Sequence, residues 1–435
     1  MMQIFRTIAL AATLFISPLA GAANAQSASP DDTARVLAGL LPSAGSPLLP
    51  LSESGAWQAH ADRFNALFTT ADNRQFKRIR AWSSAKLKDP SPVLFYMFSG
   101  PDFLYANAFF PNATTYVMAG LEPTGPIPDL SRFSRESLGS ELRGIEVSLR
   151  SILAYGFFIT KEMRSELNAT RVNGTLPILY VFLARSGKTI HEASLFRLDQ
   201  NGMPQPENTP GLSPNAAHGA KIVFTDADGR EKTLYYFSTN VANDGFKASG
   251  FASFLDGLGT GDAFVKSASY LLHSGGFSDM RNFLLAHSKL LLQDDTGVPV
   301  SYFDQPKWQL RPFGRYAGPI SIFAQHYQPR MARLFGHSEA IDFGVGYQWR
   351  NPNLLAAVRI GAVASDAPAN VPLPAAAANG DIKVISESAS EATGAEETKS
   401  ATSKPARKQA AGPKRTRKAT NHYAAPWFFW NGGFR

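Results

Sequence analysis

Two apolar runs, Val93–Phe98 and Thr115–Leu121, constrain the fold of this chain more than any other feature of its sequence. Each run has the length of a β-strand, and neither alternates polar with apolar residues, which is typical of strands buried on both faces. A turn, Ser99–Asp102, and a short apolar segment of helical character, Phe103–Phe110, separate them. This order predicts two parallel strands in a sheet covered on both sides, although the connection is short for a complete crossover.

Helical and strand-like patterns alternate through the rest of the body. Helical periodicity occurs at residues 57–87, at residues 134–157 behind the candidate N-cap Ser134, and in a further piece ending near residue 167. Strand patterns occur at residues 176–184, 190–198, 221–225 and 232–241, and the turn Asp228-Gly229 joins the last two as a hairpin. We expect mainly helix at 251–292, extended chain at 302–316, helix at 320–335 and a last strand at 341–349.

These patterns indicate an α/β (or α+β) fold with a single globular domain at residues 55–355. The domain would hold a mixed, partly parallel sheet covered by helices, with irregular loops rich in Pro and Gly. Residues 26–54 are rich in Ser, Pro, Ala and Gly, and we expect them to be a flexible lead-in.

The first 25 residues have the three parts of a secretory signal peptide in the right order. Arg6 precedes an apolar stretch, Thr7–Leu19, and Ala23-Asn24-Ala25 supplies the small-x-small cleavage pattern. A buried helix or a membrane anchor is the alternative, but the stretch is shorter than the roughly 20 residues that a span needs. The sequence therefore predicts an exported protein, periplasmic or extracellular, with no transmembrane helix in the mature chain.

Several kinds of site are excluded or unsupported by composition and motifs. The chain has no cysteine, which rules out disulfides, thiolate catalysis and cysteine zinc sites. It also lacks a His-Glu-x-x-His metal motif and a Gly-x-Ser-x-Gly nucleophile elbow. No cofactor is evident, and neither the use of a metal nor the oligomeric state follows from the sequence.

The C-terminal tail holds the positive charge of the protein. The net charge is +8, yet residues 399–435 contain nine Lys or Arg and no Asp or Glu, so the preceding residues sum to −1. Residues 362–424 have the composition of a disordered linker, basic from residue 399, and residues 425–435 form an aromatic C-terminal patch. Such an arm favours an anionic envelope polymer or lipid surface, and no nucleic acid is expected as a partner. The candidate attachment residues are Lys414, Arg415, Arg417, Lys418, Trp427 and Trp430. A solubilising linker whose aromatic end docks on the body is the alternative.

Two carboxylates follow the two apolar runs. Asp102 and Glu122 would emerge at the same edge of the sheet if the strands are parallel, and they are the candidate catalytic acid and base. The candidate binding residues around them are Ser99, Tyr105, Asn107, Asp294 and Asp295. The alternative is structural: Asp102 caps the following short helix, and Glu122 ends a strand at the surface.

Three functional hypotheses follow. The first is an exported envelope protein, of unknown specific activity, that associates with an anionic surface through its basic tail. The second is an acid/base or metal-assisted hydrolase with a carboxylate site at the sheet edge. The third is a ligand-binding or structural domain that uses the aromatic segment Tyr302–Tyr316.

Overall fold

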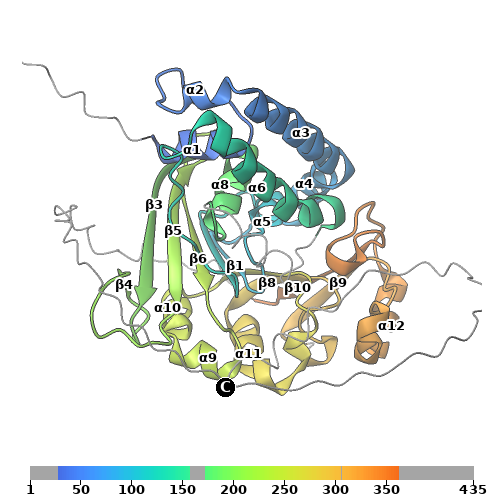
Figure 1. The fold of residues 1–435 in the computed structure, drawn as a ribbon. Helices are drawn as coiled ribbons and strands as arrows, with labels where there is room; N and C mark the ends of the chain where they lie inside the picture. Colours follow the sequence, from blue (N-terminus) through green and yellow to red (C-terminus); the bar gives the residue numbers. More distant parts are fainter. Residues whose placement is uncertain (1–27, 157–171, 305, 362–435) are drawn as a thin grey trace, which may run out of the picture.

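The computed structural model describes residues 28–156, 172–304 and 306–361, and a ten-stranded mixed sheet runs through them (Figure 1). The strand order is β4-β3-β5-β6-β2-β1-β7-β8-β10-β9. The strands are β1 (Val93–Tyr96), β2 (Thr115–Gly120), β3 (Thr189–Leu198), β4 (Pro204–Pro206), β5 (His218–Thr225), β6 (Glu231–Ser238), β7 (Gly261–Val265), β8 (Ser288–Gln293), β9 (Trp308–Gly314) and β10 (Asn353–Arg359). The predicted fold class, a mixed and partly parallel sheet with helices, is confirmed.

The five central strands, β6, β2, β1, β7 and β8, are parallel to one another. In chain order they read third, second, first, fourth and fifth, so the chain builds to one side of β1 and then crosses to its other side. Such a reversal creates a topological switch point between β1 and β7, at the carboxyl ends of the strands, where open α/β sheets bind their ligands. Antiparallel strands extend the sheet on both sides: β5, β3 and β4 beyond β6, and β10 and β9 beyond β8.

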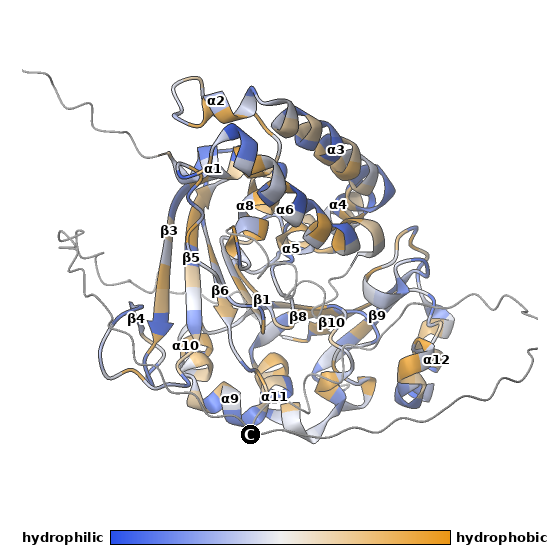
Figure 2. Cartoon of the chain, viewed as in Figure 1, coloured by the Kyte–Doolittle hydropathy of each residue, from blue (hydrophilic) through white to orange (hydrophobic). Residues whose placement is uncertain are grey.

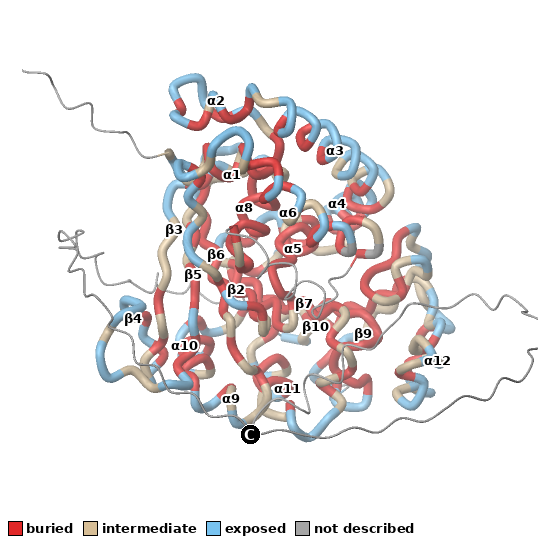
Figure 3. Tube along the Cα trace, in the orientation of Figure 1, coloured by how far each residue is buried: buried red, intermediate tan, exposed pale blue. Residues whose placement is uncertain are grey.

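Helices cover both faces of the sheet (Figures 1 and 3). One face carries α1 (Pro30–Leu37), α2 (Leu49–Ser52), α3 (Gly55–Ala71), α4 (Lys77–Lys86), α5 (Phe103–Phe109), α6 (Arg135–Tyr155) and α8 (Leu176–Arg185). On the other side of the sheet lie α9 (Asn243–Ala248), α10 (Phe251–Gly257), α11 (Ser278–His287) and α12 (Pro329–Leu334). Successive residues of β1 enter opposite cores: Leu94 and Tyr96 join one apolar cluster, and Val93 and Phe95 join the other. This is why the run is apolar at every position (Figure 2).

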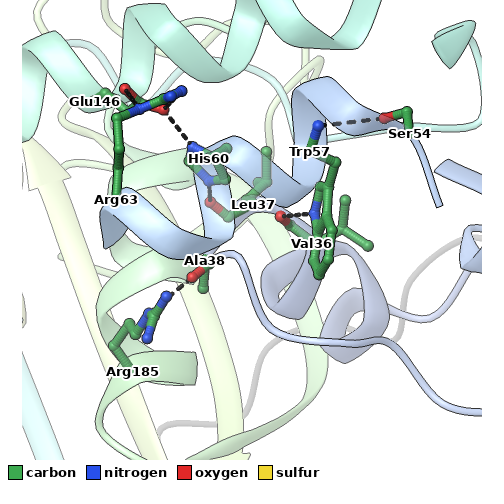
Figure 4. A network of polar contacts seen from close by, with 9 residues as sticks. All are labelled: Val36, Leu37, Ala38, Ser54, Trp57, His60, Arg63, Glu146 and Arg185. Carbon is green, nitrogen blue, oxygen red and sulfur yellow. Dashed lines mark hydrogen bonds and ion pairs between the residues drawn. The ribbon is translucent and has the colours of Figure 1, made fainter. Parts of the chain in front are cut away.

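Helix α1 is fixed by side chains that cap its C-terminal carbonyl groups (Figure 4). Trp57 Nε1 donates to Val36 O at 2.9 Å, the His60 ring bonds Leu37 O at 2.9 Å, and Arg185 Nε donates to Ala38 O at 2.7 Å. Carbonyls at the end of a helix lack the usual partner from the next turn, and the side chains bond to them here, although Val36 O also accepts the main-chain N–H of Gly39 at 3.1 Å. The flexible lead-in predicted for residues 26–54 is therefore wrong over α1, whose apolar residues Ala34, Val36 and Leu37 are fully buried.

The structure overturns three predicted elements. Residues 176–184 form helix α8 rather than a strand, because a short run buried on all sides has no periodicity that separates the two. Residues 251–292 include the central strands β7 and β8, so Leu290–Leu292 lies in a strand rather than at a helix end. The last strand is β10, whereas residues 346–348 of the predicted strand 341–349 form a 3₁₀ turn, η7 (Gly346–Gln348).

Other expectations hold or lie outside the described residues. The parallel pairing of β1 with β2, helix α6 with its Ser134 cap, and the hairpin of β5 and β6 are confirmed. The aromatic segment Tyr302–Tyr316 is extended only in part, as the edge strand β9. The signal peptide at 1–25, the helical piece ending near 167, the linker at 362–424 and the patch at 425–435 all fall outside the described residues. Among the helices of the described ranges, none is long and apolar enough to cross a membrane.

Candidate functional site

Asp102 lies at the carboxyl end of β1 and is both a helix cap and one half of a buried ion pair. Its Oδ1 accepts a hydrogen bond from Tyr105 N at 3.3 Å, which makes it the N-cap of α5. Its Oδ2 accepts one from the Tyr96 hydroxyl at 2.7 Å and lies 2.8 Å from Lys266 Nζ. Burial raises the pKa of Asp102, and the ammonium of Lys266 opposes that rise. The capping role proposed as the alternative for Asp102 is confirmed.

Lys266 follows directly after β7 and has polar and aromatic partners around its ammonium. Besides Asp102, Nζ donates to Gly156 O at 2.6 Å and lies 3.9 Å from the centroid of the Tyr105 ring. The side chains of Lys266 and Asp102 are 3% and 1% exposed. Lys266 therefore joins β7, α5 and the end of α6 in one buried polar contact, a residue that sequence reasoning missed because its segment was taken as helical.

Glu122 is buried rather than exposed at the end of a strand, so the surface alternative is wrong for this residue. Its main-chain carbonyl accepts a hydrogen bond from the Tyr236 hydroxyl at 2.9 Å. A Cβ added at Gly120 would meet Glu122 Oε2 and lie 2.9 Å from Gly100 Cα, so the carboxylate packs against the glycines that end β2 and follow β1. Asp102 instead reaches toward β7, and a shared role of the two carboxylates stays a prediction.

The other predicted binding residues separate into two groups. Ser99 is buried and donates to Gly100 O at 2.8 Å, and Tyr105 lies beneath Lys266 as described. Asn107 lies in α5 and lines a surface pocket between α3, α5 and α8. Tyr105 therefore contacts the Asp102–Lys266 pair directly, whereas Ser99 bonds the main chain at Gly100 and Ala119.

The predicted acidic pair, Asp294 and Asp295, lies at the carboxyl end of β8 and contacts the loop that follows β7. Asp294 accepts hydrogen bonds from Ser267 N at 2.9 Å and from the main chain and hydroxyl of Thr296 at 3.0 and 2.5 Å. Asp295 accepts one from the Tyr270 hydroxyl. Both carboxyl groups are almost fully buried, at 1% and 2% exposure.

Backbone strain concentrates at this edge of the sheet. Of the five non-glycine residues with positive φ in the described parts of the chain, Phe98 follows β1, and Ser267, Ser269 and Tyr270 follow β7. Their φ angles lie between 50° and 61°, a region that residues with a Cβ seldom adopt. Strained residues persist where the surrounding structure holds them, and they cluster at functional sites.

A layer of aromatic and imidazole rings lies over the acidic pair. Tyr270 stacks on His326, with ring centroids 4.8 Å apart and planes 5° apart, and His273 lies 5.1 Å from both rings. His326 ends the 3₁₀ segment η5 (Ser321–His326), and Tyr347 of η7 bonds Ser269 Oγ at 2.7 Å. Ser269, His273, His326 and Tyr347 are partly exposed, so they separate the buried pair from solvent.

The two carboxyl groups differ in their hydrogen-bond donors. Three donors stabilise the charged form of Asp294, whereas in the described part of the chain Asp295 has two, the Tyr270 hydroxyl and its own main-chain N–H. Burial and the neighbouring Asp294 charge raise the pKa of Asp295 to about 7. Burial also lowers the pKa of His273 to about 4, which keeps this imidazole neutral at neutral pH. Two polar atoms of the loop, Ser267 Oγ and His273 Nε2, are buried without a hydrogen-bond partner among the described residues.

Sequence reasoning found the acidic pair but missed Lys266, Tyr270, His273 and His326. The signal that was available is the Gly257-Leu258-Gly259 stretch, which ends a helix before β7. Within the described ranges, no group of three or more His, Asp or Glu side chains is placed to hold a metal ion. No protein-family model, curated protein or solved structure matches this chain.

Proposed function

We propose that the folded domain is an acid/base hydrolase of a small polar substrate, with Asp295 as the residue that exchanges a proton and Tyr270 as its hydrogen-bond partner. What supports the proposal is the place of the Asp295–Tyr270 contact. It lies in a strained loop at the carboxyl edge of the central parallel strands, the position where open α/β sheets bind ligands. The buried, unpartnered polar atoms of Ser267 and His273 add groups that a substrate can satisfy.

The chemistry requires a group that gives and takes a proton near neutral pH. A hydrolase uses a base to activate water and an acid to protonate the leaving group, and a pKa near the working pH serves both steps. Paired carboxyls whose surroundings differ divide these roles, because the proton resides on the less stabilised anion. Among the described residues Asp294 has three donors and Asp295 has two, which favours the proton on Asp295.

Hydrolysis of three chromogenic substrates tests the proposal: p-nitrophenyl acetate, p-nitrophenyl phosphate and p-nitrophenyl β-glucoside, each incubated with the full mature chain. We expect turnover of at least one substrate and a loss of roughly 10²- to 10⁴-fold in Asp295→Asn. Asp262→Asn is the matched control, because Asp262 is also a buried carboxyl but lies at the amino end of β7. The proposal fails if none of the three is hydrolysed above the buffer rate, or if the two variants lose activity equally.

The charge layout favours a second function, association with an anionic surface after export. We propose that the signal-like residues 1–25 direct export, and that the basic residues from 399 onward hold the protein at an anionic envelope polymer or lipid. Lys414, Arg415, Arg417 and Lys418 would supply the electrostatic attraction, and Trp427 and Trp430 would insert at the interface. Support comes from the separation of charge, +9 in residues 399–435 against −1 in the rest.

Deletion of residues 399–435 tests this second function. The shortened chain should leave the envelope fraction at low salt. Purified without residues 399–435, the mature protein should also lose binding to phosphatidylglycerol vesicles, while its binding to phosphatidylcholine vesicles should not change. Deletion of residues 365–398 is the control, since it shortens the same linker without removing the basic cluster. Equal fractionation of the two deletions would exclude the electrostatic role of the tail.

A further inference from the structure

A pocket of about 450 Å³ opens among α3, α4, α5 and α8, and none of its lining residues belongs to the acidic pair. Its walls come from the end of α3, the start of α4, one face of α5 and the end of α8. A single turn of π-helix, η1 (Asp72–Phe76), joins α3 to α4 and contributes three of the lining residues. Turns of this kind occur often at functional sites. The volume is within the range of about 300–1,000 Å³ typical of small-molecule sites.

The charged groups of the pocket sum to +1. Arg80 and Arg185 are its cations, and Asp72 is its anion. Arg80 Nη2 lies 2.8 Å from Asp72 Oδ1, so this pair neutralises itself across the π-turn. Arg185 has no carboxylate partner among the described residues, which leaves one guanidinium charge without a counter-charge.

Arg185 is held in place before any ligand binds. Its Nε donates to Ala38 O at 2.7 Å and its Nη1 donates to Asn65 Oδ1 at 2.6 Å, while the guanidinium lies 5.1 Å from the centroid of the Phe68 ring. These two bonds use two of its five N–H donors. A fixed guanidinium with free donors loses little conformational entropy on binding an anion.

The uncharged part of the lining divides evenly into apolar and polar residues. Phe68, Phe76, Leu104 and Ala108 form apolar wall, and the side-chain oxygen of Asn107 is buried without a partner in the described part of the chain. An apolar wall beside a preorganised cation suits a ligand that combines a hydrocarbon or aromatic body with one negative charge.

We propose that this pocket binds a small monocarboxylate with an apolar body, whose carboxylate pairs with Arg185 and whose body packs against Phe68 and Phe76. The pocket shares no residue with the acidic pair or its ring layer. The proposal therefore stands independently of the hydrolase proposal.

Calorimetric titration of the full chain with benzoate tests the proposal, with benzyl alcohol and inorganic phosphate as the neutral and non-apolar probes. We expect benzoate to bind at least about tenfold more tightly than either probe. Thr69→Glu adds a carboxylate to the exposed pocket wall and should weaken benzoate binding about tenfold. Thr70→Glu is the matched control, because it adds the same charge one residue further along α3 and outside the pocket lining.

Each other result overturns the proposal. Equal binding of benzoate and benzyl alcohol would show that the guanidinium charge is not used, and equal binding of benzoate and phosphate would show that the apolar wall is not used. Unchanged binding in Thr69→Glu, or the same loss in Thr70→Glu, would place the carboxylate elsewhere on the protein. Circular dichroism spectra of both variants establish that α3 is intact.

Discussion

Lys266 Nζ lies 2.8 Å from Asp102 Oδ2, and this buried pair connects the end of β7 to the first turn of α5. It bridges the two strands on either side of the switch point, because Asp102 follows β1. Tyr96 and Gly156 satisfy further hydrogen bonds of the two side chains. A buried ion pair of this kind fixes geometry more than it stabilises the fold, yet the loss of one partner leaves an uncompensated charge.

Removal of either partner should therefore destabilise the protein strongly. We expect Lys266→Met and Asp102→Asn each to lower the free energy of unfolding by about 3–5 kcal/mol, and the double variant to lose less than the sum of the two. The exposed pair Arg135–Glu53, at 2.7 Å, is the control, and Arg135→Gln should cost less than about 1 kcal/mol. Urea denaturation measures all four, and additive losses would contradict a coupled pair.

Gly346 holds a conformation that the acidic pair requires. Its φ is +59°, and an added Cβ would collide with the Asp294 carboxylate and stand 2.5 Å from Ser267 Oγ. Gly229, with φ +75°, has open space around its Cβ position and serves as the control. Gly229→Ala should cost about 1–2 kcal/mol from backbone strain alone. Gly346→Ala should cost more and displace the loop after β7, which near-ultraviolet circular dichroism of Tyr270 and Tyr347 would register.

The capping of α1 by Trp57 provides a test of hydrogen bonding in the core. Trp57 Nε1 donates to Val36 O, whereas the buried Trp82 Nε1 has no hydrogen-bond partner among the described residues. Trp57→Phe and Trp82→Phe remove the same atoms, but only the first removes a hydrogen bond, after which Val36 O keeps the main-chain N–H of Gly39 at 3.1 Å. We expect Trp57→Phe to cost about 0.5–1.5 kcal/mol more in urea denaturation. An equal loss would show that packing, not the bond, determines both values.

The sequence predicts this fold best where the pattern of apolar residues within one segment decides how that segment is buried. The runs that became β1 and β2 are apolar at every position because their residues enter two cores, and the prediction of a covered parallel pair followed from that. Asp102 was likewise found because it follows the first run. These features are local, so the sequence carries them directly.

The remainder depends on contacts between distant segments. Helix α8 and strand β8 are both short and mostly buried, so their apolar runs do not distinguish helix from strand. Lys266 meets Asp102 across 164 positions of the chain, and Tyr270 meets His326 only after η5 folds back. Contacts between segments so far apart in the chain cannot be predicted from the spacing of residues. This explains why the acidic pair was predicted without its partners.

Asp262 provides a pH test of burial at the end of β7 away from the site. Its carboxylate accepts hydrogen bonds from Ser91 N at 2.8 Å and Ser91 Oγ at 3.2 Å, yet burial raises its pKa from 3.8 to about 6. The folded state therefore holds this proton more tightly than the unfolded state. The resulting stabilisation is complete below pH 3.8 and is lost as the pH rises through 6.

Asp262→Asn should remove this dependence, because the amide has nearly the same shape and stays uncharged. The variant should gain stability relative to the natural protein between pH 4 and pH 6, by up to about 3 kcal/mol, and the difference should be constant above pH 7. Urea denaturation at one-unit steps of pH measures it. A difference that is the same at every pH would mean that Asp262 keeps its ordinary pKa in the folded protein, and that its two bonds to Ser91 offset the desolvation of the carboxylate.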